Sequence, residues 1–171
     1  ISHAITAPNG LAINAIREAF GSALIDASGK LDRDKMRDLV FNDPQARKKL
    51  EGILHPIIAE VTMASVAQHA KAPYVVIVVP LLAESPAWIE RCNRILVIDC
   101  DVSTQIERVM QRSGLSREQV LNIIASQATR DDRKAIANEV IVNESTLEAL
   151  TQQVTRLHEY YLRLAASNSA K

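Results

Sequence analysis

Two short apolar runs constrain the fold of this chain more than any other feature. The first lies within residues 73–84 (PYVVIVVPLLAE), and the second is residues 94–99 (RILVID). Short β-branched runs bounded by polar or turn residues are typical of buried strands in a parallel sheet. Both runs lead into charged residues, and ligands of open α/β sheets bind beyond the carboxyl ends of the strands. We therefore predict an α/β fold with a ligand site in these loops.

Composition narrows the classes of partner. Lysine and arginine number 20, and so do aspartate and glutamate, so no global positive field recruits nucleic acid or an acidic membrane. The longest unbroken apolar run, Val75 to Leu82, contains Pro80 and is too short to span a bilayer. We expect Cys92 and Cys100 to be reduced thiols in a cytoplasmic protein. At 171 residues the chain is expected to form one domain.

Helical periodicity and capping residues account for most of the remaining chain. Asp43 and Pro44 suit the cap and first position of a helix, and we expect that helix to be interrupted at His55-Pro56. A short strand is expected at residues 139–142. The helices are expected at residues 11–20, 31–41, 44–54, 57–71, 103–113, 116–127 and 146–166.

Arginines on one expected helix could bind phosphate. Arg108 and Arg112 are four residues apart and share a helical face, so together they could grip a polyphosphate. Gly114 would then allow a turn, and Ser116 would cap the next helix. The alternative is a solvated face that pairs with nearby acidic side chains.

A second basic segment, residues 127–133 (QATRDDR), lies further along the chain. Arg130 or Arg133 could stabilise charge on a transferring phosphoryl group. The alternative is pairing with the acidic residues three positions away. Both interpretations stay open from the residues alone.

Three further polar residues lie where a ligand could reach them. Glu84 and Asn143 each come after an expected strand, and either could contact a ligand or simply sit in a loop. His55 could contact a substrate or mark a helix boundary. It has no second histidine or cysteine at ligand spacing, so we expect no metal ligand in the chain. The sequence contains neither G-x-x-x-x-G-K-S/T nor G-x-G-x-x-G.

An ordered set of segments resembles the dephospho-coenzyme A kinase family. Each segment is weakly specific, but their order and spacing together are strongly specific, and they run along nearly the whole chain. They are residues 29–33 (GKLDR), 50–57 (LEGILHPI), 73–84, 94–99, 105–112 (QIERVMQR), 127–130 (QATR) and 140–143 (VIVN).

The resemblance implies a phosphate-loop kinase fold, with a parallel sheet flanked by helices. It implies ATP-dependent phosphorylation, with Mg²⁺, of the ribose 3′-hydroxyl of dephospho-coenzyme A. Residues 31–71 would form a helical region on the coenzyme A side, and residues 103–127 would form a lid. The implied site residues are Arg130 as the catalytic arginine, Arg108, Arg112 and Asn143 on the ATP side, and His55, Pro80, Leu81 and Glu84 on the acceptor side.

The chain also departs from the family pattern. In the family, a first strand, the phosphate loop and an Asp-Ala-Asp segment with the presumed base precede a stretch that Ile1-Ser-His-Ala resembles. We therefore expect the chain as given to be inactive alone and to leave apolar surface and unpaired backbone in the middle of the sheet. Asn138 stands where the family usually has aspartate, which is expected to weaken a local contact.

Other functions remain open at this point. One is a related kinase that acts on a nucleotide or a small alcohol. Another is a non-catalytic module that binds coenzyme A or a partner protein, which the absent phosphate loop favours. A nucleic-acid binder is a remote third because the chain is neutral and has few aromatic residues. We expect a monomer or a small homo-oligomer.

Overall fold

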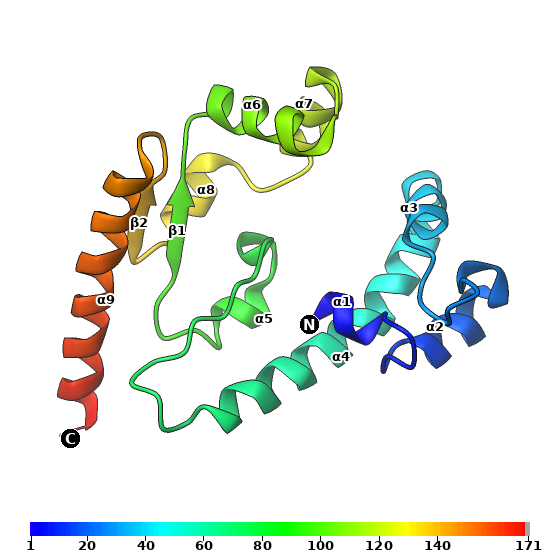
Figure 1. Cartoon of the computed structure of the whole chain (residues 1–171), viewed down its shortest axis with the longest axis horizontal. Coiled ribbons are helices and arrows are strands. Elements are labelled where there is room, and N and C mark those ends of the chain that lie inside the picture. Colours follow the sequence, from blue (N-terminus) through cyan, green and yellow to red (C-terminus); the bar gives the residue numbers. More distant parts are fainter. Residues whose placement is uncertain (170–171) are drawn as a thin grey trace. The chain divides into compact units, whose positions relative to one another are not determined.

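The structure, a computed structural model, describes residues 1–169 (Figure 1). Its internal contacts divide the chain into an N-terminal unit (Ile1–Val75) and a C-terminal unit (Val76–Lys171). The expectation of one domain over residues 1–171 stays a prediction. The N-terminal unit is helical, with α1 (Ser2–Ile5), α2 (Ile13–Phe20), the 3₁₀ turn η1 (Ser22–Leu24), α3 (Arg33–Asn42) and α4 (Pro44–Gln68).

Local capping sets the helix boundaries of the N-terminal unit. The Asp32 carboxylate accepts a hydrogen bond from the Lys35 amide at the start of α3. Asp43 accepts from the amides of Gln45 and Ala46 at the start of α4, where Pro44 is the first residue. These bonds satisfy amides that no helix hydrogen bond can reach. The expected start of α4 at Pro44 is confirmed, whereas α2 and α3 begin two residues later than expected, at Ile13 and Arg33.

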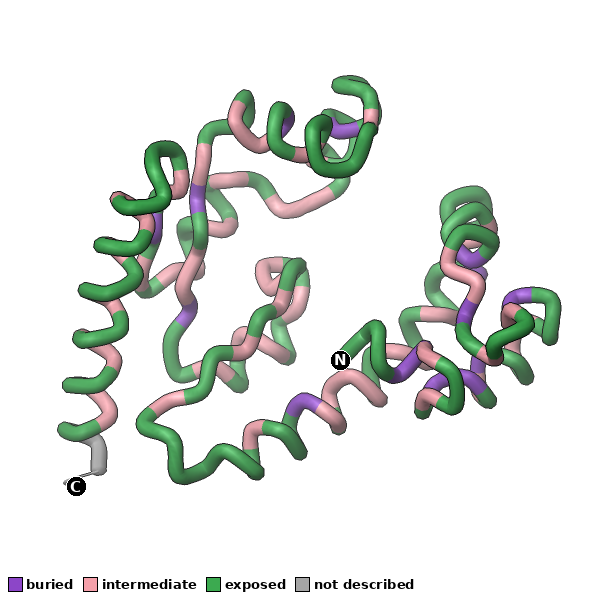
Figure 2. The backbone as a smooth tube through the Cα atoms, in the orientation of Figure 1, coloured by how far each residue is buried: buried purple, intermediate pink, exposed green. Residues whose placement is uncertain are grey.

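An apolar cluster holds the helices of this unit together. Buried residues come from α1, α2, α3 and the segments between them, and partly buried residues of α4 pack against them (Figure 2). The buried members are Ile5, Ala12, Ile13, Ile16, Leu24, Leu31 and Met36. Removing such side chains from water is the main stabilising contribution to a small helical unit.

The expected helix break at His55-Pro56 is wrong, because α4 continues through Pro56. Proline removes one backbone hydrogen bond and crowds the carbonyl four residues earlier, which costs about 3 kcal/mol in a helix interior. Packing on both sides of Pro56 opposes that cost. Residues at helical spacing along α4 contact the core before and after it, namely Leu50, Ile53, Leu54, Ile57, Ile58 and Val61.

Helix α4 is also long and apolar enough to cross a membrane by length and composition. One 18-residue window has a mean hydropathy of 1.3. The expectation that no segment approaches a membrane span was therefore too strong. The residues of α4 that pack against the core account for part of this apolar composition, although only 6% of the window is buried.

The C-terminal unit contains the sheet. Its elements are η2 (Leu82–Glu84), α5 (Pro86–Ile89), β1 (Leu96–Asp99), α6 (Val102–Ser113), α7 (Arg117–Ala125), α8 (Arg130–Ala135), β2 (Glu139–Val142) and α9 (Leu147–Ser169). β1 and β2 pair in parallel, with Leu96 opposite Glu139 and Asp99 opposite Val142. Helix α8 contacts β1, and α9 contacts β2 (Figure 1). The strands expected at residues 94–99 and 139–142 are confirmed.

The strand expected within residues 73–84 is wrong in this structure. Residues 75–79 belong to no helix or strand, and Val76 and Val78 are 68% and 85% exposed. A parallel strand is stable only when its backbone pairs with neighbours on the sheet. Within residues 1–169 this run has no strand partner, so its β-branched side chains alone do not make it a strand.

The helices of residues 102–125 form where their local signals predict them. Gly114 ends α6 in the left-handed conformation at φ 67°, where glycine has no Cβ to clash. Ser116 and Gln119 exchange hydrogen bonds in a capping box at the start of α7.

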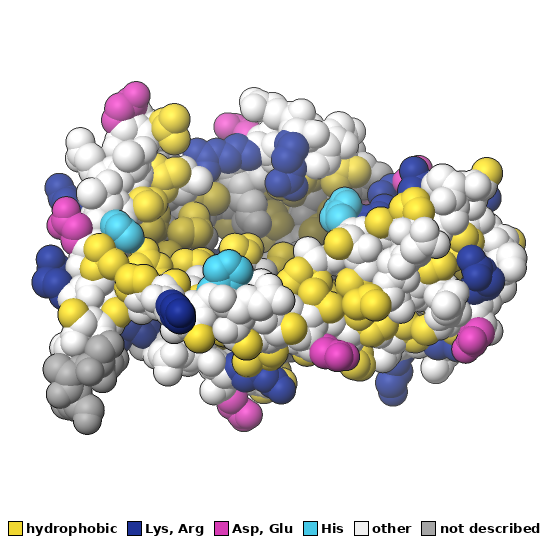
Figure 3. All heavy atoms as spheres, turned by 60° about the horizontal axis from the view of Figure 1, so that its bottom comes forward, with side chains coloured by type: hydrophobic (Ala, Val, Ile, Leu, Met, Phe, Trp, Pro, Cys, Tyr) yellow, Lys and Arg dark blue, Asp and Glu magenta, His cyan; other side chains and the backbone are white. Residues whose placement is uncertain are grey.

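Cys92 and Cys100 are both free, as expected. Hydrophobic side chains cover much of the face drawn in Figure 3.

Candidate functional site

The carboxyl ends of β1 and β2 lie side by side and carry polar residues. The Asn143 amide donates to the Asp99 carbonyl at 2.8 Å, which continues the ladder past the end of β2. The Asp99 side chain is only 4% exposed. A carboxylate removed from water in this way is stable only with cationic or hydrogen-bonding partners. The groups that neutralise Asp99 therefore define the centre of the site.

Arg130, the first residue of α8, is one partner of Asp99. Its Nε and Nη2 donate to the two carboxylate oxygens at 2.8 and 2.7 Å, a bidentate pair. Its Nη1 donates to Asp101 at 2.8 Å, and Glu144 lies 3.6 Å from Nη2. The expected alternative, pairing with acidic residues three positions away, does not describe Arg130. Its ion pairs are with Asp99 at the end of β1 and with the loops after β1 and β2.

Lys134 is the second partner of Asp99, and the sequence reasoning missed it. Its Nζ lies 2.8 Å from Asp99 Oδ2. Lys134 is four residues after Arg130 on α8, so both side chains share one helical face. Thr129 and Asp132 exchange hydrogen bonds in a capping box that starts this helix. Arg130 and Lys134 have the same four-residue spacing as Arg108 and Arg112, so the sequence does contain a signal for this pair.

These contacts fix the charge state of the cluster. Hydrogen bonds from Arg130 and then Lys134 hold the pKa of Asp99 well below its usual value of 3.8, although burial opposes the shift. The bonds to Asp99 and Asp101 raise the pKa of Arg130. Asp99 and Arg130 are therefore both charged at neutral pH. Asp101 is 58% exposed, so it is the partner of Arg130 that an anionic ligand could displace most readily.

The structure also brings together two residues predicted on the ATP side. Arg108 of α6 donates from Nη1 to the Asn143 carbonyl at 2.7 Å. Arg112, one turn further along α6, makes a weak contact from Nε to the Ser113 hydroxyl at 3.4 Å. Both arginines belong to a shallow depression on α6. Neither has an ion pair among residues 1–169, so the alternative, a solvated face that pairs with nearby acidic side chains, is not observed there.

Glu84 supports the segment that leads into α8. Its Oε1 accepts a hydrogen bond from the Ala128 amide at 2.8 Å, and the Ala128 carbonyl accepts from Arg133 at 2.6 Å. The bond between Glu84 and Ala128 joins residues that are 44 positions apart in the sequence. Ala128 lies two residues before Arg130. Pro80 and Leu81 precede the turn that contains Glu84, and Leu81 is exposed. Their expected contacts with substrate stay predictions.

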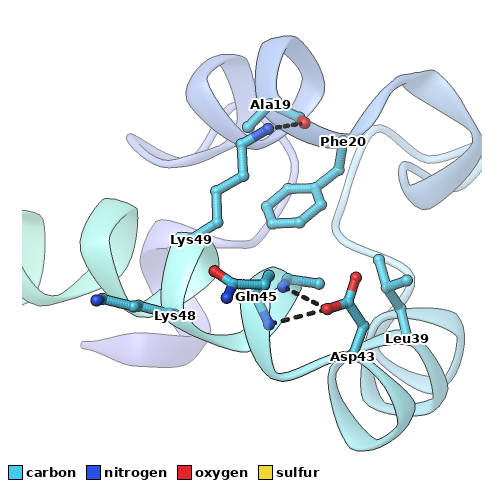
Figure 4. A pocket seen from close by; sticks show the side chains of 8 residues that line it. Ala19, Phe20, Leu39, Asp43, Gln45, Lys48 and Lys49 are labelled. Atoms are coloured by element: carbon cyan, nitrogen blue, oxygen red, sulfur yellow. Dashed lines mark hydrogen bonds between the residues drawn. The ribbon is translucent and has the colours of Figure 1, made fainter.

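The N-terminal unit contains His55 and an open pocket. His55 is exposed on α4. The pocket, about 670 Å³, lies between α2, α3 and α4, and none of the predicted site residues lines it (Figure 4). Several of its polar groups already have structural partners. Lys49 donates to the Ala19 carbonyl at 2.6 Å and lies 5.2 Å from the centre of the Phe20 ring, and Asp43 caps α4.

A polar group at the opposite ends of the strands supports the sheet. The Asn138 side-chain oxygen accepts from the Ile95 amide at 2.8 Å, so the contact expected to be weakened at this position is present. Glu139 accepts hydrogen bonds from Arg94 and, at 2.8 Å, from the Tyr161 hydroxyl. Burial, together with the bond to Glu139, raises the pKa of Tyr161. This group joins β1 and β2 to α9.

The described residues do not form a metal cage of their own. Residues 1–169 contain no group of three or more His, Cys, Asp or Glu side chains placed to hold an ion. The carboxylates at the strand ends are engaged by Arg130 and Lys134.

Comparison with known proteins identifies the family. The family model for dephospho-CoA kinase matches residues 1–149. The chain is 52% identical to a dephospho-CoA kinase of Cupriavidus pinatubonensis, covering 98% of this chain and 82% of that protein. It is 54% identical to one of Burkholderia lata, covering 98% and 83%.

Solved structures agree with the sequence relatives. The dephospho-CoA kinase of Campylobacter jejuni has a TM-score of 0.67 and 25% identity over 98% of this chain and 82% of that one. A Thermus thermophilus structure has a TM-score of 0.68 and 30% identity, covering 88% and 81%. The fold is therefore the α/β phosphate-loop kinase fold, and the chain belongs to the dephospho-CoA kinase family.

Proposed function

We propose that the protein transfers the terminal phosphoryl group of ATP to the ribose 3′-hydroxyl oxygen of dephospho-coenzyme A, with ADP as the second product. The observation that carries this proposal is the position of Arg130. Its guanidinium is fixed by Asp99 at the carboxyl ends of parallel strands, in a chain about half identical to proteins named for this activity. Ligands of open α/β sheets bind at such strand ends.

Arg130 suits the role of stabilising the phosphoryl group in transfer. Catalysis of phosphoryl transfer depends on positioning and on cations aimed at the developing charge. A phosphate oxygen could replace the exposed Asp101 on Nη1 while the buried Asp99 keeps the other two nitrogens in place. The guanidinium would then contact the phosphoryl group in transfer while it stays hydrogen-bonded to Asp99.

The other predicted residues divide between the two substrates. Arg108, Arg112 and Asn143 would contact ATP, and the bond from Arg108 to the Asn143 carbonyl supports a shared position for two of them. His55, Pro80, Leu81 and Glu84 would lie on the acceptor side. Mg²⁺ would be held by the ATP phosphates with water. We propose a cytoplasmic location, and a monomer or small homo-oligomer.

The test is product formation by the protein expressed from its complete reading frame. Purified protein with ATP, Mg²⁺ and dephospho-coenzyme A should release ADP and form a product heavier by one phosphate, placed at the 3′ position by NMR. Nucleoside monophosphates and small alcohols should react at least about 100-fold more slowly, since a missing substrate contact leaves buried polar groups unpaired. Turnover of another acceptor at the higher rate would replace this proposal with a related kinase. Binding of coenzyme A without turnover would replace it with a binding module.

A further inference from the structure

A second arginine, Arg33, is fixed in the N-terminal unit by contacts far away in sequence. Its Nη2 donates to the Thr6 hydroxyl at 2.7 Å, and its Nη1 lies 3.1 Å from His3 Nε2. Thr6 is only 4% exposed, and its hydroxyl also donates to the Ser2 carbonyl at 3.0 Å. Arg33 is the first residue of α3, so these bonds tie that helix to the first residues of the chain.

Arg33 has no carboxylate partner, although acidic residues flank it. Asp32 caps α3 and pairs with Lys35 at 2.9 Å, and Asp34 pairs with Arg37 at 3.0 Å. Throughout residues 1–169, Arg33 forms no ion pair. Its contacts are a hydroxyl and an imidazole ring rather than a carboxylate. Hydrogen bonds therefore hold the guanidinium of Arg33 in place, and no carboxylate of the described residues neutralises its charge.

This geometry suits an anion of phosphate type. A guanidinium presents five N–H donors in a planar fork that matches two oxygens of a phosphate, and the two contacts leave most of these donors unused. When Nε2 accepts from Arg33, a neutral His3 ring carries its proton on Nδ1, which adds a donor. Arg33 is partly exposed and His3 is exposed, so a dissolved ligand can reach both.

We propose that Arg33 and His3 form a binding site for a phosphate group of a substrate. This inference rests on the proposed function, because both substrates carry the required chemistry. Dephospho-coenzyme A contains a diphosphate, and ATP contains a triphosphate. The role is ground-state binding, so removal of the site raises a KM rather than abolishing turnover.

The first experiment compares two arginines of the same helix. Arg33→Gln should raise the KM for the substrate that supplies the phosphate about 10- to 100-fold, as expected for the loss of charge-assisted hydrogen bonds. Whichever KM rises, that of dephospho-coenzyme A or that of ATP, identifies the source. Arg37→Gln is the matched control, since Arg37 is one turn further along α3 and is already paired with Asp34. It should change either KM less than about twofold.

A second set separates ligand binding from a purely structural bond. Thr6→Val removes the same hydrogen bond but keeps the cation, so it should raise the KM at most about threefold. His3→Ala removes a ligand donor, so it should raise the same KM more than Thr6→Val and less than Arg33→Gln. Inorganic diphosphate, titrated into the protein by calorimetry, should bind at least about tenfold more weakly to Arg33→Gln.

The outcomes are distinct. Equal KM values for Arg33→Gln and the unsubstituted enzyme would overturn the phosphate site. So would equal effects of Thr6→Val and Arg33→Gln that parallel the loss of thermal stability. Failure of the unsubstituted protein to phosphorylate dephospho-coenzyme A would overturn the proposed function instead, and the diphosphate titration would still test the site.

Discussion

Different kinds of internal contact stabilise the two units of this protein, each considered by itself. The N-terminal unit has a continuous apolar cluster built from neighbouring helices. In the described part of the C-terminal unit, the buried apolar side chains are Ile95, Ile106, Val120 and Ile141. There the connections between elements include the ion pairs of Asp99, the hydrogen bond that Glu84 accepts from Ala128 and the hydrogen bond that Arg94 donates to Glu139. One unit is stabilised mainly by hydrophobic burial, and the other depends more on directed polar contacts.

The difference arises from how helices and strands satisfy their backbone groups. A helix makes its hydrogen bonds internally, so its apolar face needs only a nearby partner. A strand needs partners that are distant in sequence, and its apolar side chains remain exposed without them. Val76 and Val78 are exposed, whereas Ile13 and Ile16 of α2 are buried. The polar contacts of the C-terminal unit also include Arg130 and Asp99, the residues that the proposed phosphoryl transfer depends on.

The largest expected effect is on Arg130. Arg130→Ala should lower kcat about 10³-fold, which corresponds to about 4 kcal/mol of barrier, because it removes a cation from the transferring phosphoryl group. It should also lower the free energy of unfolding by about 1–2 kcal/mol, since Asp99 loses one partner that is one-third exposed. Steady-state kinetics and urea unfolding measure the two effects.

A matched control for Arg130 is Arg156→Ala, because Arg156 is an exposed residue of α9. It should leave both kcat and the urea midpoint nearly unchanged. If Arg130→Ala keeps its kcat and loses only stability, Arg130 is an ion-pair partner of Asp99 without a role in transfer.

The apolar unit should be most sensitive at Ile16. Ile16 is fully buried in α2, and Ile16→Ala should lower the free energy of unfolding by about 2–5 kcal/mol through lost burial and a residual cavity. Leu11→Ala is the control, since Leu11 precedes the same helix and is 69% exposed. It should cost less than about 0.5 kcal/mol. Similar urea midpoints for the two variants would contradict an apolar core in this unit.

Features that depend on short-range chemistry could be predicted from the sequence. Asp43 and Pro44 at the start of α4, the capping box of Ser116 and the turn at Gly114 each involve residues within four positions of one another. Strand β2 was predicted at residues 139–142, where the structure places it. Asp99 and Asn143 meet at the strand ends, and the ligand site expected in the loops beyond them stays a prediction.

Features that depend on distant contacts could not be predicted in the same way. The run at residues 75–79 has the composition of a strand, but composition does not supply a neighbouring strand. Pro56 has the chemistry of a helix breaker, yet core contacts on both sides of it keep α4 continuous. The link from Glu84 to Ala128 joins residues 44 positions apart and left no local signal. Lys134 did leave one, its spacing from Arg130.

The next effect in size tests the polar unit through pH. Because the pKa of Asp99 is lowered in the folded state, its ion pairs contribute stability above pH 3.8, and that contribution is lost as pH falls below this value. Asp99→Asn should be about 1–2 kcal/mol less stable than the unsubstituted protein at pH 7. The gap should stay constant from about pH 7 to pH 5 and narrow below about pH 4.

Urea unfolding across this pH range measures the gap between the two proteins. Asp131→Asn is the control, because Asp131 is exposed on the same helix as Arg130 and forms no ion pair among residues 1–169. Its difference from the unsubstituted protein should stay below about 0.5 kcal/mol at every pH. A gap for Asp99→Asn that does not depend on pH would show that the Asp99 charge contributes nothing to folding.

The smallest expected effect concerns the outer edge of β2. The Gln153 side chain accepts from the Val142 amide at 3.1 Å and donates to the Val142 carbonyl at 2.9 Å, so one side chain satisfies both backbone groups of an edge residue. Gln153→Ala should cost about 1 kcal/mol and raise hydrogen exchange at the Val142 amide about fivefold. Gln152→Ala changes the adjacent, exposed glutamine of α9 and should be neutral or slightly stabilising, because alanine favours helix. If both variants leave Val142 equally protected, the strand edge does not depend on this amide, and directed polar contacts matter less in the C-terminal unit than the comparison implies.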